Sequence, residues 1–134
     1  MSALKIMETL AARLRKEGYR VSTPVPEEGK LDWQNMSLAE AVAIKKGFLD
    51  DYFEVIRDAD IVLIANVEKH GIDGYVGANT LMEAACGHAL RKPVIFLHPV
   101  GMQACQIEAC AISSGILHGD AARLKELLAD LSAS

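Results

Sequence analysis

Two short runs of apolar residues constrain the fold of this 134-residue chain more than any other feature. Residues 61–65 are Ile-Val-Leu-Ile-Ala, and residues 94–97 are Val-Ile-Phe-Leu. Strands without polar alternation are typical of parallel sheets, in which helices cover both faces. The amphipathic segment between the two runs supplies the crossover helix that parallel strands require. The pattern predicts an α/β fold.

The other segments continue the alternation of helices and strands. Ser37 and Glu40 form a capping-box pattern that opens a long helix, and Asp120 is placed to cap the last helix. The remaining predicted elements are a helix over residues 2–16, a strand over 19–25, a helix from 37 to about 57, a short helix over 106–112, a strand over 115–120 and a helix after residue 120.

Together these elements predict a single domain over residues 1–134. Its fold class is α/β, with a flavodoxin- or Rossmann-like doubly wound parallel sheet of four to five strands and right-handed crossovers. Doubly wound domains of this size usually begin with a strand, whereas this chain begins with a helical pattern. We therefore expect a sheet edge or groove where a first strand lies in such folds.

Charge and composition exclude several classes of protein. The net charge of −4 argues against a nucleic-acid binder, which needs a basic face to neutralise phosphates. No apolar run approaches the ~20 residues that span a membrane, and the N-terminus lacks a signal peptide's apolar region. Three cysteines without CxxC spacing indicate reduced thiols in a cytoplasmic protein. We expect no metal and no cofactor.

Polar residues that follow the predicted strands mark the candidate site. In open parallel sheets, ligands bind beyond the carboxyl ends of the strands. Asn66 follows the first apolar run and His98 the second, and the intervening glycine-containing loop leads to the helix that carries Glu83. Two interpretations of Glu83 remain open. It is either a nucleophile, or the acidic half of a capping box with Thr80 in the first turn of its helix.

The region from residue 57 to residue 97 resembles the nucleoside 2-deoxyribosyltransferase-like superfamily, which includes the 2'-deoxynucleoside 5'-phosphate N-hydrolases. The family pattern is an Ala-Asp-hydrophobic strand, a glycine-containing loop, G-T-x-x-E-x-G-x-A and then G-K-P before the next strand. The matching residues here are Ala59-Asp60, Gly77-Ala78-Asn79-Thr80, Glu83, Gly87, Ala89 and Lys92-Pro93.

The resemblance implies cleavage or transfer at the N-glycosidic bond of a nucleoside or nucleoside 5'-monophosphate. The residue matching Glu83 is the family's nucleophile, which attacks C1' of the sugar and displaces the base. The implied substrate-binding positions are Asn66, Gly77, Ala78 and Asn79, with His98 beside them. The choice between transfer to a second base and hydrolysis stays open, as does recognition of a phosphate.

The chain departs from the family pattern at three places. Gly77 stands where the family commonly has an aspartate, and Asn66 stands where an acidic residue is common. The family's first strand has no counterpart before Ser2. These departures leave open a catalytically inactive nucleotide-binding module, or an assembly domain of the same fold.

The long helix also predicts self-association. Its apolar arc is wider than one sheet face requires, so Phe48, Tyr52 and Phe53 have surface left for a partner. Related transferases assemble as oligomers in which a neighbour helps to close the pocket. We therefore expect a homodimer or a higher homo-oligomer.

Overall fold

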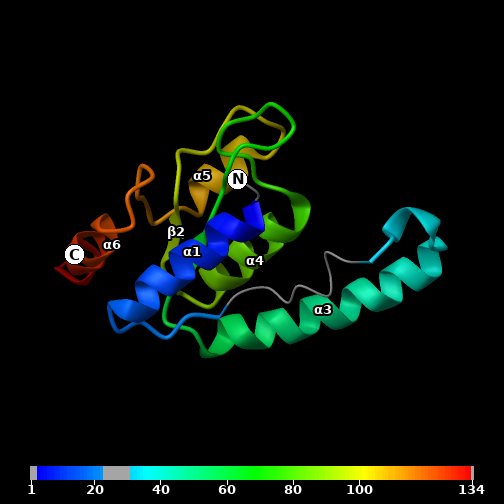
Figure 1. The fold of residues 1–134 in the computed structure, drawn as a ribbon, viewed down its shortest axis with the longest axis horizontal. Coiled ribbons are helices and arrows are strands. Elements are labelled where there is room, and N and C mark those ends of the chain that lie inside the picture. The colour runs from blue at the N-terminus through cyan, green and yellow to red at the C-terminus, as the bar shows by residue number, and fades with distance from the viewer. Residues whose placement is uncertain (1–2, 23–30, 134) are drawn as a thin grey trace.

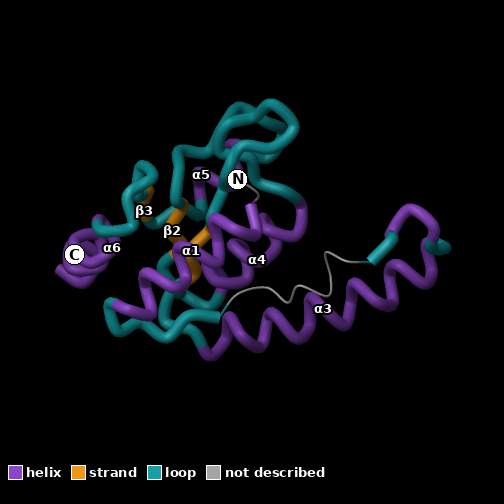
Figure 2. The backbone as a smooth tube through the Cα atoms, viewed as in Figure 1, coloured by secondary structure: helices purple, strands orange, loops and turns teal. Residues whose placement is uncertain are grey.

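The computed structural model describes residues 3–22 and 31–133, and within them the chain is a mixed α/β structure with a three-stranded parallel sheet (Figure 1). Figure 2 shows the strands at the centre with the helices around them. The elements in chain order are α1 (Ala3–Lys16), the 3-10 helix η1 (Trp33–Asn35), α3 (Leu38–Asp58), β1 (Val62–Ile64), α4 (Ala78–Ala89), β2 (Val94–Phe96), α5 (Gln106–Ala111), β3 (Gly115–Ile116) and α6 (Arg123–Ala133).

The sheet has the strand order β1-β2-β3, and both neighbouring pairs are parallel. Leu63 pairs with Ile95, and Phe96 pairs with Ile116. The two apolar runs therefore form the adjacent strands β1 and β2, as their sequences predict. Hydrogen bonds carry the pairing slightly further, because the Leu97 N–H donates to the Ile64 carbonyl at 2.8 Å and the Leu117 N–H donates to the Phe96 carbonyl at 2.9 Å.

Successive strand residues point to opposite faces of the sheet, and each face has its own apolar cluster. Val62, Ile64, Val94 and Phe96 belong to one cluster, which includes residues of α3, α4 and α5. Ile95, Leu97 and Leu117 belong to the other, which includes Leu14 of α1 and Leu124 of α6. Helices therefore cover both faces, as expected for strands that are apolar throughout.

The predicted strand over residues 19–25 is not found in residues 19–22, and residues 23–25 lie outside the described part of the chain. The backbone here bonds to α1 instead of to a strand. The Tyr19 N–H donates to the Leu14 carbonyl at 3.0 Å, and Arg15 Nη2 donates to the Val21 carbonyl at 2.8 Å. Within the described residues the sheet therefore has three strands, whereas the sequence predicts four to five.

Helix α3 begins where the sequence predicts. The Ser37 Oγ accepts a hydrogen bond from the Glu40 N–H at 3.1 Å. Its C-terminal half packs on the sheet through Ile56, with Tyr52 and Phe53 packed against the same cluster. Tyr52 and Phe53 are thus partly used within the chain's own core. The N-terminal half extends beyond the other helices (Figure 1).

Candidate functional site

The carboxyl ends of β1 and β2 are joined by the side chain of Asn66. Its amide nitrogen donates to the His98 carbonyl at 2.8 Å, and its amide oxygen accepts from the His98 N–H at 2.9 Å. Asn66 is 2% exposed, so its amide continues the ladder between the two strands. One donor and one acceptor of the amide are thus bonded within the chain, which gives Asn66 a structural role, and its contact with a sugar stays a prediction.

The half-buried His98 occupies the middle of this edge. A Cβ built on Gly119 would lie 3.3 Å from the His98 ring, so the imidazole packs on the backbone of the turn after β3. The Gly119 N–H donates to the Leu97 carbonyl at 2.8 Å, which holds that turn in place. His118, one residue earlier, is exposed and has a positive φ of 52°.

Gln103 fixes the glycine-containing loop that connects β1 to α4. Its amide nitrogen donates to the Gly74 and Gly101 carbonyls at 3.1 and 3.0 Å, and its amide oxygen accepts from the Val76 N–H at 2.9 Å. Gly74 and Gly101 lie so close that the Gly101 N–H donates to the Gly74 carbonyl at 3.1 Å. Nothing in the local sequence around Gln103 indicates this role, because its partners Gly74 and Val76 lie almost thirty residues earlier.

The start of α4 differs from the predicted capping box. Gly77 is the N-cap residue without a side-chain cap, and the helix begins at Ala78. The Leu81 N–H already donates to the Gly77 carbonyl at 2.9 Å, so Thr80 lies inside the first turn. Glu83 is the sixth residue of the helix and belongs to its second turn, where it cannot complete a capping box. The cap interpretation of Glu83 is therefore wrong.

Glu83 is half-buried and lies near Tyr52 of α3. Burial raises the pKa of the Tyr52 phenol to about 12, and the negative charge of Glu83 adds to the shift. The phenol is therefore protonated at neutral pH. Sequence reasoning did not connect these two residues, because they are placed on different helices by the packing of α3 against α4.

The contact between α3 and α4 extends to their C-terminal ends. Lys92 Nζ, just after α4, donates to the Arg57 carbonyl at 2.8 Å. Cys86 lies one turn after Glu83, and burial raises the pKa of its thiol while Arg57 opposes the shift. In the other direction Asn79 lies one turn before Glu83, on the same side of α4. Asn79 and Glu83 thus share a flank of α4, whereas Asn66 and His98 lie at the end of the strands.

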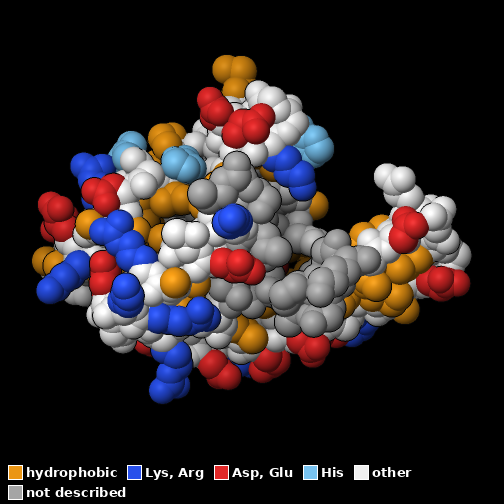
Figure 3. Space-filling view, viewed as in Figure 1, with side chains coloured by type: hydrophobic (Ala, Val, Ile, Leu, Met, Phe, Trp, Pro, Cys, Tyr) orange, Lys and Arg blue, Asp and Glu red, His pale blue; other side chains and the backbone are white. Residues whose placement is uncertain are grey.

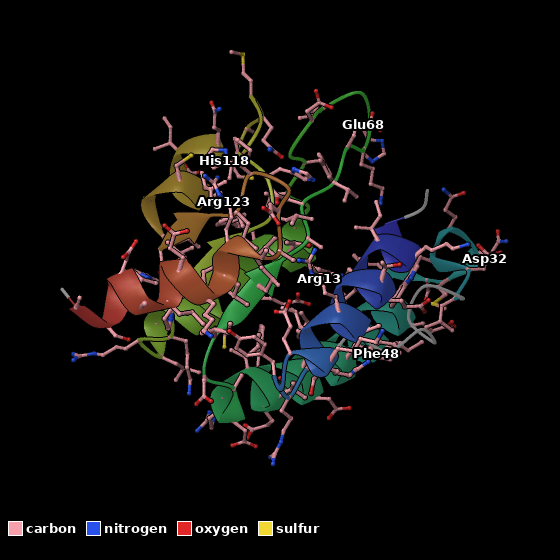
Figure 4. The ribbon with its side chains drawn as sticks, turned by 60° about the vertical axis from the view of Figure 1, so that its left-hand side comes forward. Arg13, Asp32, Phe48, Glu68, His118 and Arg123 are labelled. Carbon is pink, nitrogen blue, oxygen red and sulfur yellow. The ribbon has the colours of Figure 1, made fainter. Side chains whose placement is uncertain are left out.

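Surface hollows lie along α3 and beside β3, and neither of these is lined by a predicted site residue. One, of about 440 Å³, runs along α3 and includes Trp33, Val42 and Leu49. The other, of about 390 Å³, lies beside β3 and includes Cys110 and Ser114. Phe48 belongs to α3, the helix along which the first hollow runs, and Glu68, on the loop after β1, lies well away from it (Figure 4).

Within residues 3–22 and 31–133, no three His, Cys, Asp or Glu side chains come together as a possible metal site. The cysteines Cys86, Cys105 and Cys110 are free thiols. None of the described helices has both the length and the apolar character needed to cross a membrane.

Comparison of the chain with protein-family models, with curated proteins and with solved structures finds no match. The class that the structure defines is therefore a mixed α/β protein with a parallel sheet. The resemblance to the deoxyribosyltransferase-like superfamily remains a hypothesis that rests on the sequence pattern.

Proposed function

We propose that the protein cleaves or transfers at the N-glycosidic bond of a nucleoside or nucleoside 5'-monophosphate, with Glu83 as the nucleophile. The observation that carries this proposal is the position of Glu83. It is half-buried in the second turn of α4, where a helix cap does not explain it, and it lies near the half-buried phenol of Tyr52. It also occupies the place of the nucleophile in the family pattern.

The proposed fold is the flavodoxin- or Rossmann-like doubly wound parallel sheet. The parallel strands and the helices on both faces support it. Within the described residues β1 pairs with β2 alone, so its other edge is where a further strand fits. The N-terminal end of α4, at Gly77 and Ala78, lies on the loop side of the sheet, and its backbone N–H groups are suited to bind a sugar or phosphate oxygen.

The proposed reaction has two displacements at C1'. A Glu83 carboxylate oxygen bonds to C1' while the C1'–N bond breaks, and the electron pair leaves with the base, which takes a proton from water. Water or the nitrogen of a second base then attacks C1', breaks the sugar ester and loses a proton. Glu83 is returned as a carboxylate. Each step proceeds through oxocarbenium-like charge that the carboxylate stabilises.

One observation favours the non-catalytic alternative, a nucleotide-binding module or an assembly domain. The Asn66 amide, which stands where the family commonly has an acidic residue, is bonded at both ends to the backbone of His98 and is buried. Calorimetry with nucleoside monophosphates separates the possibilities. Binding without turnover indicates a module, and no binding indicates an assembly role.

The direct test of the enzymatic proposal follows free base after incubation with a panel of deoxynucleosides and their 5'-phosphates. We expect base release by the native protein, and a loss of at least about a hundredfold in Glu83→Gln, since a nucleophile splits the difficult step in two. Glu126→Gln on α6, an exposed glutamate in a first helical turn, is the matched control and keeps full activity. Base release that is unchanged in Glu83→Gln refutes the assignment.

A further inference from the structure

The loop between β1 and α4 begins with a small hairpin. The Lys69 N–H donates to the Ile72 carbonyl at 3.2 Å, and the Ile72 N–H donates to the Lys69 carbonyl at 3.0 Å. His70 and Gly71 between them have positive φ of 54° and 75°, as in the tight turns that join antiparallel strands. The Glu68 carboxylate accepts from the Gly71 N–H at 3.0 Å. The hairpin therefore has a defined shape.

The second half of this loop is fixed by the loop that follows β2, and Figure 1 shows the two loops side by side at the top of the view. Gln103 bonds to the Gly74 carbonyl at 3.1 Å and to the Val76 N–H at 2.9 Å. Cys105 Sγ donates to the Val76 carbonyl at 3.6 Å. These bonds hold the backbone both before and after Tyr75, so its side chain starts from a fixed position.

The Tyr75 ring lies at the start of α4 and contacts the His70 ring of the hairpin. Its Cε1 lies 3.5 Å from the position of a Cβ built on Gly77, the N-cap residue. The ring centroids of His70 and Tyr75 are 5.2 Å apart, and their planes meet at 77°. Tyr75 is half-buried and His70 is exposed. Two rings at nearly a right angle form a corner in which a third flat ring stacks on one and meets the edge of the other.

The position of the two rings agrees with a nucleoside whose sugar lies at Glu83. Ligands of open parallel sheets bind beyond the carboxyl ends of the strands, where this loop lies. From Gly77 to Glu83, α4 rises about 9 Å at 1.5 Å per residue, and helical side chains lean towards the N-terminus. A base beside Tyr75 and a sugar beside Glu83 are therefore compatible with a single bound nucleoside.

The charge of the hairpin favours a neutral ring over a phosphate. Glu68 and Asp73 carry two negative charges and Lys69 carries one positive charge, so their formal sum is −1. Figure 3 shows acidic and histidine side chains at the surface of this end of the molecule. The base is the flat and uncharged part of a nucleotide, whereas a phosphate is repelled by a net negative charge. The base is therefore the part that fits this loop.

We propose that His70 and Tyr75 bind the base of the substrate, and we call these two residues the base corner. The assignment rests on the proposed function, because that reaction supplies the base. Gln103 is a positioning residue, which holds Tyr75 in place through the backbone on either side of it. A contact that is formed before the ligand arrives requires little ordering on binding.

The first test measures binding by calorimetry in the Glu83→Gln background, in which substrate is not consumed. The probes are the four deoxynucleoside 5'-monophosphates, and 2-deoxyribose 5-phosphate, which lacks the base. We expect Tyr75→Leu to weaken nucleotide binding about tenfold, as the loss of a base–aromatic contact does. Binding of the sugar phosphate is expected to stay unchanged. Tyr75→Phe keeps the ring and is expected to bind nucleotide like its parent.

Tyr19→Leu is the matched control for Tyr75→Leu. Tyr19 is also half-buried, but it packs against the cluster that includes residues of α1 and α6. This variant is expected to keep the parent's affinity for nucleotide. His70→Asn removes the second ring at a position whose positive φ asparagine accepts. We expect it to weaken nucleotide binding about threefold, less than Tyr75→Leu does.

The positioning role of Gln103 is tested by comparing Gln103→Ala with Gln106→Ala. Gln106 is also half-buried, and its Nε2 donates to the Val100 carbonyl at 3.2 Å within its own segment. We expect Gln103→Ala to weaken nucleotide binding about threefold and to speed exchange of the Val76 amide hydrogen with water. Gln106→Ala is expected to do neither. Equal nucleotide affinity of the two variants overturns the positioning role.

Binding and base release are measured separately, so the base corner and the nucleophile can fail separately. Nucleotide that binds Tyr75→Leu as tightly as its parent refutes the base corner, even where base release depends on Glu83. Nucleotide binding that requires Tyr75, without base release that requires Glu83, supports the base corner and refutes the nucleophile. A chain that binds none of the four nucleotides overturns both.

Discussion

The two halves of α3 carry one apolar stripe with two different environments. In the C-terminal half Ile56 belongs to the buried cluster of the sheet, and Tyr52 and Phe53 pack against it. In the N-terminal half Leu38 and Val42 remain exposed. Apolar residues at the same helical spacing thus serve the chain's own core in one half and are exposed in the other. Periodicity identifies an apolar face, but it does not say what covers that face.

The largest expected effect comes from removing a large side chain from each half of α3 and comparing the losses of stability. Ile56→Ala leaves a cavity in the core, so we expect the free energy of unfolding to fall by about 2–5 kcal/mol. Val42→Ala removes exposed surface, so we expect a change within about 0.5 kcal/mol. Urea denaturation of dilute protein measures both. Equal losses in the two variants contradict the division of the helix.

The pH dependence of stability tests how the C-terminal half of α3 packs against α4. The pKa of Tyr52 is raised from 10.0 to about 12 in the folded chain, mainly by burial. The folded state therefore holds its phenol proton more tightly than the unfolded state does. This contribution, at most roughly 3 kcal/mol, is fully present below pH 10 and is lost as the pH rises towards 12.

The variant that checks this pH dependence is Tyr52→Phe, which removes the loss between pH 10 and 12. Glu83→Gln is expected to lower the pKa of Tyr52, because it removes the neighbouring negative charge. The absorbance of tyrosinate, followed in a background with Tyr19→Phe and Tyr75→Phe, measures that pKa directly. A Tyr52 pKa that does not respond to Glu83→Gln contradicts their proximity.

The smallest expected changes in stability come from replacing two helical glycines by alanine. A Cβ on Gly47, in the N-terminal half of α3, meets nothing within 4 Å, whereas a Cβ on Gly87 in α4 would lie 2.6 Å from Val62 Cγ2. Gly47→Ala is therefore expected to stabilise the chain by about 1 kcal/mol through helix propensity. Gly87→Ala is expected to destabilise it by about 1 kcal/mol or more, since α4 must move away from β1. Thermal unfolding shows the two opposite shifts, and shifts of the same sign go against this packing.

Much of the scaffold follows from the sequence. The runs at residues 61–65 and 94–97 form β1 and β2, because strands buried on both faces require continuous apolar residues. The start of α3 at Ser37 is also confirmed, because its cap is a local interaction between Ser37 and Glu40. Both predictions depend on residues that are neighbours in the chain.

The details of the candidate site depend on residues far apart in the chain, and here the sequence was a poorer guide. Thr80 and Glu83 match a capping box, yet Gly77 caps α4 one turn earlier. Asn66 is placed as a ligand residue by its position after β1, but the His98 backbone takes both ends of its amide. No local pattern reveals that Tyr52 lies beside Glu83, since only the packing of α3 on α4 brings them together.

The role of Glu83 is tested most directly by looking for the sugar on its side chain. The protein is mixed with the deoxynucleoside or 5'-phosphate that releases base fastest, quenched in acid and digested, and the peptide containing Glu83 is weighed by mass spectrometry. We predict a mass increase equal to the bound sugar on Glu83, which is absent in Glu83→Gln together with base release. Release of base that continues in Glu83→Gln, or no release from any substrate in the panel, contradicts the proposal.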